Sequence, residues 1–169
     1  MIIKLLKAYL EKHREQKRIS QQYILEKKCV DYFNKDMLRM TNFTRELVKT
    51  IDVKVNSIPI IAKFNKDKFS IQAVNVCKSF DNKDIELYYG QFLYSKTPEW
   101  FALIKDLPEE LWMSVEEYSR PTRPVLLLCD YDANHYEVVE YADKEWVTEL
   151  CFPVQPTRYF VLEFLTENR

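Results

Sequence analysis

The stretch PVLLLCDYDANHYEVVEY, residues 124–141, decides the fold of this chain. An unbroken apolar run, residues 125–128, leads into Cys129-Asp130-Tyr131-Asp132, and Ala133-Asn134-His135 separates it from a second strand-like run, residues 136–141. Two such runs joined by turn-forming residues predict a β-hairpin. The first run has no polar residue until its end, which is typical of a strand at the centre of a sheet.

The runs before and after this hairpin predict further strands. Residues 58–64 and 69–76 flank a polar tetrapeptide and predict a second hairpin. The alternation of the later run breaks at Ala73, which predicts a β-bulge. Residues 85–94 and 159–165 predict two more strands.

The amino-terminal third of the chain predicts helix. Residues 2–33 contain no Pro or Gly and are rich in Lys, Glu, Leu and Gln, which favour helix. Their apolar stripe is interrupted by the polar residues 11–18 and resumes from Ile19. This gap disfavours a long coiled coil and favours a helix that crosses solvent between two docking sites. A second helix is predicted over residues 37–51.

Two short helices are predicted between the strands, because a proline begins each of them. Pro98 precedes the apolar run that starts at Trp100, and Pro108 precedes two glutamates in a first turn. The predicted fold is therefore α+β, with amino-terminal helices followed by a mostly antiparallel sheet of about six or seven strands and two short helices inserted.

Charge divides the chain into two predicted units. Residues 1–50 have twelve Lys and Arg against six Asp and Glu, a balance of +6, whereas the remainder has thirteen against twenty, a balance of −7. The net charge of −1 hides this asymmetry. We predict a basic helical arm over residues 1–51 and an acidic α+β body over residues 52–169.

Glycine occurs once in the chain, at Gly90. A P-loop needs two glycines and a dinucleotide-binding fingerprint needs three, because backbone amides have to approach phosphate closely. The GxSxG nucleophile elbow of α/β-hydrolases also needs two. These three kinds of site are excluded, and we predict no cofactor.

Cysteine spacing and hydropathy bear on location. The four cysteines, at positions 29, 77, 129 and 151, include no CxxC pair, so we predict reduced structural thiols in a cytoplasmic protein. No apolar stretch approaches the roughly 18 residues of a membrane span, and the start of the chain has the wrong order for a secretory signal. We do not expect a membrane partner, although the segment at residues 2–10 would suit a membrane surface.

Asp130 and Asp132 are two residues apart on a predicted strand, so their side chains share a face. An Asp-x-Asp at the edge of a sheet holds Mg²⁺ or Mn²⁺ in many hydrolases, and His135 would join across the turn. One alternative is therefore a metal-dependent hydrolase or nuclease with these three ligands. The competing interpretation is turn chemistry, in which Asp and Asn dominate. Cys129, which follows the apolar run, is predicted to be an inert buried thiol.

The body carries a dense set of carboxylates, and such a surface engages basic protein partners, including ones that normally bind nucleic acid. The predicted partner-binding face consists of Glu116, Glu117, Asp130, Asp132, Glu137, Glu140, Asp143 and Glu145. Our leading hypothesis is a non-enzymatic cytoplasmic binding or inhibitory protein that acts through this face on a basic protein.

The arm offers a further alternative, which is nucleic-acid binding through phosphate contacts. Its basic residues are Lys4, Lys7, Lys12, Arg14, Lys17 and Arg18. Interspersed glutamates make an ordinary solvated helix face the competing interpretation. The same helix is also a candidate for pairing between copies of the chain.

Several runs around the central hairpin carry a loose family resemblance. They are Trp112–Glu116, Pro124–Leu128, Val138–Tyr141 and Trp146. Together they resemble a small domain of unknown function common in phage and prophage proteins. The closing aromatic-and-proline signature of that family is absent, because residues 152–156 match it only in part. The resemblance implies a phage or mobile-element origin.

Overall fold

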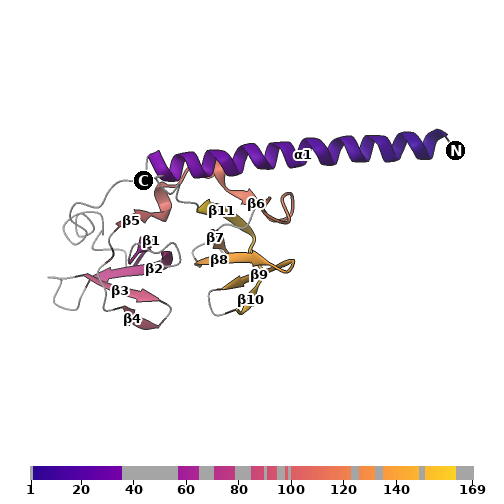
Figure 1. The fold of residues 1–169 in the computed structure, drawn as a ribbon. Coiled ribbons are helices and arrows are strands. Elements are labelled where there is room, and N and C mark those ends of the chain that lie inside the picture. Colours follow the sequence, from indigo (N-terminus) through magenta and orange to yellow (C-terminus); the bar gives the residue numbers. More distant parts are fainter. Residues whose placement is uncertain are drawn as a thin grey trace, which may run out of the picture.

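In a computed structural model of the chain, the described residues are 2–35, 57–64, 71–78, 85–89, 91–94, 98, 100–122, 126–131, 135–148 and 151–162. They form one long helix and two antiparallel sheets (Figure 1). The predicted α+β class is confirmed. Within these residues the strands form a sheet of five and a sheet of six, where the sequence predicted one sheet.

Along the chain, the helix comes first, the strands of the first sheet follow it, and the strands of the second sheet come last. The helix α1 spans Ile2–Lys35. The first sheet, in the order β4-β3-β2-β1-β5, consists of β1 (Ile58–Lys63), β2 (Ile71–Lys78), β3 (Ile85–Tyr89), β4 (Phe92–Tyr94) and β5 (Trp100–Leu103). The 3-10 helices η2 (Ile104–Asp106) and η3 (Glu109–Leu111) follow. The second sheet, in the order β10-β9-β8-β7-β11-β6, consists of β6 (Met113–Ser114), β7 (Leu126–Asp130), β8 (Tyr136–Ala142), β9 (Glu145–Thr148), β10 (Pro153–Val154) and β11 (Arg158–Leu162).

The central hairpin of the sequence lies in the interior of the second sheet. β7 has β8 on one side and β11 on the other, and its Leu127 and Leu128 are fully buried. β7 and β8 are antiparallel, with Asp130 opposite Tyr136. The predicted hairpin and the central position of its first strand are both confirmed.

Strand β2 is buried on both faces. Ile71 and Ala73 belong to the large core that includes β7 and β8, whereas Val74 and Val76 belong to a second core on the other face of the first sheet. The pairing of β1 with β2 continues without a break from one end to the other. The predicted bulge at Ala73 is therefore wrong, and the lost alternation reflects burial of both faces.

Residues 85–94 form two strands where the sequence predicted one. Tyr89 lies opposite Phe92, so β3 and β4 are the two arms of a tight hairpin. In the sequence, Gly90 lies between these two strands, and glycine is a common turn residue.

The helix predicted from Pro98 is instead strand β5. Its residues pair with β1, with Ile60 opposite Leu103. A proline at the start of a helix is a local signal, but Trp100 and Phe101 favour strands, and pairing completes the hydrogen bonding of β1. The second predicted short helix is reduced to the single 3-10 turn of η3.

Helix α1 confirms the long helix of the sequence, and its carboxy-terminal half packs on the body while its amino-terminal half projects past the sheets (Figure 1). The packed face consists of Gln22, Glu26, Cys29 and Val30, which are at most 3% exposed. The apolar residues from Ile19 onward are exposed in part: Ile19, Tyr23 and Ile24 are 45% to 56% exposed. The predicted helix over residues 37–51 and the boundary predicted between residues 51 and 52 lie outside the described residues.

Buried hydrogen bonds fix α1 to the body. The carboxylate of Glu26 is fully buried and accepts hydrogen bonds from the Thr122 amide at 2.9 Å and from Gln22 Nε2 at 3.0 Å. The Thr122 hydroxyl donates to its other oxygen. Gln22 Nε2 also lies 3.0 Å from the hydroxyl of Tyr159 on β11. A helix glutamate therefore satisfies donors that belong to the body.

Replacing Glu26 by alanine is expected to lower the free energy of unfolding by about 1–3 kcal/mol, because the Thr122 donors and the buried amide of Gln22 lose their acceptor. The exposed Glu11 on the same helix provides the matched control, and Glu11→Ala should change stability by less than about 0.5 kcal/mol. Urea unfolding followed by tryptophan fluorescence measures both. Equal stability of the two variants would show that the buried carboxylate does not fix the helix.

Candidate functional site

Three of the predicted acidic residues come together on the hairpin formed by β8 and β9. Glu140, Asp143 and Glu145 are all exposed. Asp143 and Lys144 have positive φ angles of 50° and 70°, and Ala142 pairs with Glu145. This is a two-residue turn of the kind that joins antiparallel strands tightly. Its carboxylates therefore project from a well-defined hairpin.

Glu116 and Glu117 lie elsewhere in the second sheet. They follow β6, which is at the opposite edge of the sheet from β9 and β10. Arg18 of α1 donates a hydrogen bond of 2.9 Å to the backbone oxygen of Glu117. The structure therefore separates the predicted acidic face into at least two groups, one near the helix and one on the β8–β9 hairpin.

Asp130 is a buried ion-pair partner in this structure. Its side chain is 5% exposed, and Arg158 Nε donates to Asp130 Oδ2 at 2.8 Å. The hydroxyl and amide of Thr157 donate to the backbone oxygen of Asp130, each at 2.8 Å. Arg158 also pairs with Glu109. Because the Asp130 side chain is buried and paired with Arg158, it is not available to contact a partner as part of the predicted acidic face.

Arg158 is held from a second direction by an aromatic ring. Its guanidinium lies 4.6 Å from the centre of the Trp112 ring, a cation–π geometry. Trp112 in turn lies against Tyr136 and Phe160, with ring centres 6.0 Å and 5.7 Å apart. Burial raises the pKa of the Tyr136 phenol. No sequence pattern indicates a role for Arg158, because its partners are separated from it by 28 and 49 residues.

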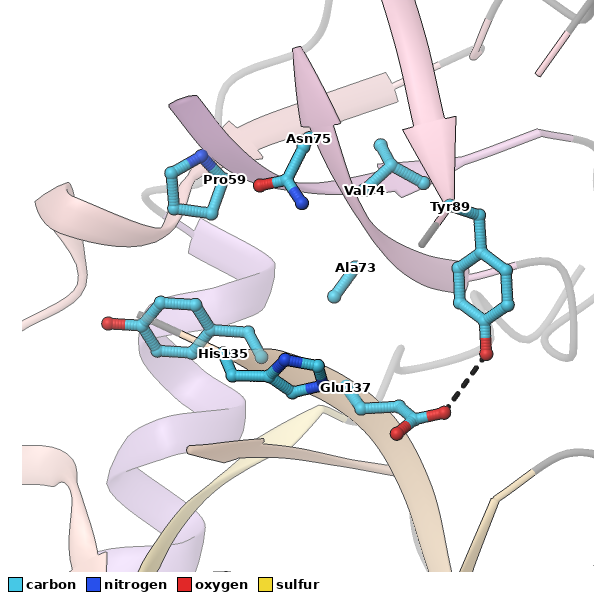
Figure 2. A pocket seen from close by; sticks show the side chains of 8 residues that line it. Pro59, Ala73, Val74, Asn75, Tyr89, His135 and Glu137 are labelled. Carbon is cyan, nitrogen blue, oxygen red and sulfur yellow. Dashed lines mark hydrogen bonds between the residues drawn. The ribbon is translucent and has the colours of Figure 1, made fainter. Parts of the chain in front are cut away.

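Glu137 and His135 line a cavity between the two sheets (Figure 2). The hydroxyl of Tyr89 on β3 donates to Glu137 Oε1 at 3.0 Å, and this bond links the sheets. The cavity has a volume of about 240 Å³, and Ala73 and Asn75 of β2 form part of its opposite wall. Glu137 is therefore separated from the other acidic residues, and its carboxylate forms a hydrogen bond between the two sheets.

A larger and more apolar cavity lies beside the first one. Its volume is about 390 Å³, and both cavities share Ala73 and Tyr89. Val138, Val139 and Ala142 supply apolar surface, while Glu140 lies on its lining as well. The size is at the lower end of the range for small-molecule sites. Glu140 thus belongs both to the lining of this cavity and to the exposed hairpin.

The predicted metal ligands are only partly described. Asp130 is engaged by Arg158, His135 is exposed beside the ring of Tyr131 at 5.5 Å, and Asp132 lies outside the described residues. In the part of the chain that the structure describes, no three His, Cys, Asp or Glu side chains gather as a metal site. An arginine on one carboxylate disfavours a cation there, because the two positive charges compete for the same oxygens.

The predicted basic residues of α1 are on the projecting half of the helix or next to it. Lys4, Lys7, Lys12, Arg14 and Lys17 are exposed. Arg18 is partly buried, and it pairs with Glu15 besides contacting Glu117. None of the described helices contains a stretch long and apolar enough to span a bilayer.

Comparisons with known protein families, with curated proteins and with solved structures find no match.

Removing Arg158 is expected to destabilise the protein strongly, because it leaves Asp130 buried and unpaired. We predict that Arg158→Met lowers the free energy of unfolding by about 3 kcal/mol, whereas Arg18→Met, which breaks a more exposed pair, costs less than about 1 kcal/mol. Adding Asp130→Asn to Arg158→Met should recover part of the loss. Denaturant unfolding of the four proteins tests this, and an Arg158→Met loss no larger than that of Arg18→Met would contradict it.

Thiol reactivity should follow burial. Burial raises the pKa of the Cys29 thiol to about 12 and that of Cys129 well above its ordinary value, so both remain protonated near neutral pH. Cys151 is exposed. At about pH 8 we expect a thiol reagent to label Cys151 rapidly, while Cys29 and Cys129 react only after unfolding. Mass spectrometry of labelled peptides measures the order, and rapid labelling of Cys29 in the folded protein would refute it.

Proposed function

We propose that the protein is a non-enzymatic binding protein whose β8–β9 hairpin engages a basic surface on a protein partner. The observation that supports this is the set of exposed carboxylates Glu140, Asp143 and Glu145, none of which forms a salt bridge within the described residues. With Lys144 between them, the group has a charge of −2. Unpaired exposed charge of one sign attracts and orients a partner of the opposite sign.

The hairpin is a firm support for such a contact. Trp146 of β9 is 7% exposed and packs edge-on against Tyr141 of β8, with ring centres 5.0 Å apart. Trp146 also lies 5.0 Å from the ring of Tyr159 on β11. A buried indole thereby anchors the hairpin in the core, and carboxylates on an anchored strand lose little conformational freedom on binding.

The chemistry of the carboxylates suggests the class of partner. Arginine and lysine side chains that bind phosphate also bind carboxylate, because both groups accept charge-assisted hydrogen bonds. A basic protein surface that normally contacts nucleic acid is therefore a suitable partner, and occupying that surface would inhibit it. Cytoplasmic location and a phage or mobile-element origin belong to this proposal as well.

The proposal predicts salt-sensitive capture that depends on the hairpin. Immobilised full-length protein should retain basic proteins from a lysate at about 50 mM salt and release them by about 500 mM, where screening is strong. The triple variant Glu140→Gln/Asp143→Asn/Glu145→Gln should retain much less. Quantitative mass spectrometry of the eluates measures the difference.

The matched control removes three charges elsewhere on the body. Glu110→Gln/Glu116→Gln/Glu117→Gln changes the net charge by the same amount, and it should retain the same proteins as the unmodified chain. If both triple variants retain equally little basic protein, binding depends on net charge alone and does not require the hairpin. Retention that does not depend on salt would contradict the proposal. Retention that disappears after nuclease treatment would also contradict it, and would favour nucleic-acid binding by the basic arm.

A further inference from the structure

The projecting half of α1 carries an uncovered apolar stripe. Its large apolar residues are 45% to 79% exposed: Ile2, Ile3, Leu5, Leu6, Tyr9 and Leu10. A second exposed group follows further along the helix: Tyr23 and Ile24, with Ile19 nearer the packed face. Monomeric proteins rarely expose contiguous apolar patches of this kind, and such patches mark interaction sites.

The stripe faces away from the body. A helix advances about 100° per residue, so the centre of Leu5, Leu6 and Tyr9 lies roughly 140° around the axis from the centre of Gln22, Glu26 and Cys29. The latter residues are the ones that pack on the body. The body of the same chain therefore lies on the other side of the helix and leaves the stripe open.

The order of apolar and polar residues along α1 suits antiparallel pairing with a second copy of the same helix. Apolar residues 2–10 and 19–24 flank a polar middle, in which His13, Gln16, Lys17 and Ser20 are exposed on the same side as the stripe. When two such helices lie antiparallel, each apolar group covers the other, and the two polar middles meet. A bilayer surface fits less well, because it would have to accept the polar middle between the two apolar groups.

Charge also permits the pairing. Lys4, Lys7, Arg14 and Arg18 lie on the side of the helix opposite the stripe, whereas Lys12 and Lys17 flank it and Lys27 follows it on the same side, by the same advance per residue. Two antiparallel helices joined by their stripes would therefore keep the first four of these cations apart. The two bodies would be on the outer sides of the pair, since each body packs on the face opposite its stripe.

We propose that α1 forms an antiparallel homodimer through its exposed apolar face, with residues 2–10 of each copy against residues 19–24 of the second copy. The two-fold axis passes between residues 14 and 15, so that Leu6 lies beside Ile24 of the second copy and Leu5 beside Tyr23. The dimer holds two copies of the body at opposite ends of the helix pair. This inference does not depend on the acidic hairpin.

The test is a charge exchange on the full-length chain, with mass measured by light scattering during size-exclusion chromatography. The unmodified protein should have twice the mass of the chain at micromolar concentrations. Leu6→Glu and Ile24→Lys should each raise the dissociation constant by roughly tenfold or more, because each places a charge against an apolar side chain. The double variant Leu6→Glu/Ile24→Lys should restore the dimer, because the antiparallel arrangement brings the two charges together.

Controls separate this dimer from other occupants. Leu93 on β4 is 60% exposed and far along the chain, so Leu93→Glu should leave the mass unchanged. A monomeric unmodified protein at about 100 µM would overturn the proposal, as would single variants that remain dimeric. Failure of the double variant to recover would overturn the antiparallel register. Sedimentation of a monomer with phosphatidylserine vesicles, lost in Leu6→Glu, would assign the face to a membrane instead.

Discussion

The buried carboxylate of Glu26 is the interaction on which the arrangement of helix and sheets depends. It satisfies the amide and hydroxyl of Thr122 and the amide of Gln22, while Gln22 contacts Tyr159 on β11. A buried charge without such donors would be costly. Because polar groups with directional bonds hold the helix, its rotation about its own axis is fixed. That rotation determines which helix face meets the core and which face meets solvent.

The sequence predicted the elements better than their faces. The apolar run before Asp130 and the turn after it were sufficient to place the central hairpin, since both signals are local. The sequence did not identify the packed face of α1, because Ile19, Tyr23 and Ile24 are more hydrophobic than Gln22 and Glu26. The buried polar pair becomes favourable only through Thr122 and Tyr159, which are distant in sequence and carry no periodic signal.

For the candidate sites too, local sequence patterns do not reveal which side chains are buried. Asp143 lies in the turn between β8 and β9, where aspartate is common, whereas Glu145 begins β9. Asp130 looked equally exposed in the sequence, but its side chain is 5% exposed and is paired with Arg158. Spacing along a strand reveals which side chains share a face. It does not reveal whether that face meets solvent or another element, so an Asp-x-Asp pattern describes a metal site and a structural ion pair equally well.

The position of strand β2 between two cores affects how the body unfolds. One of its faces contributes to the core shared with β7 and β8, and the other contributes to the core enclosed by β1 and β3. Neither core remains intact once this strand leaves. The two sheets are therefore coupled into one cooperative unit of unfolding rather than two independent ones. The amide hydrogens at the centre of β2 would then exchange only as fast as the whole body opens.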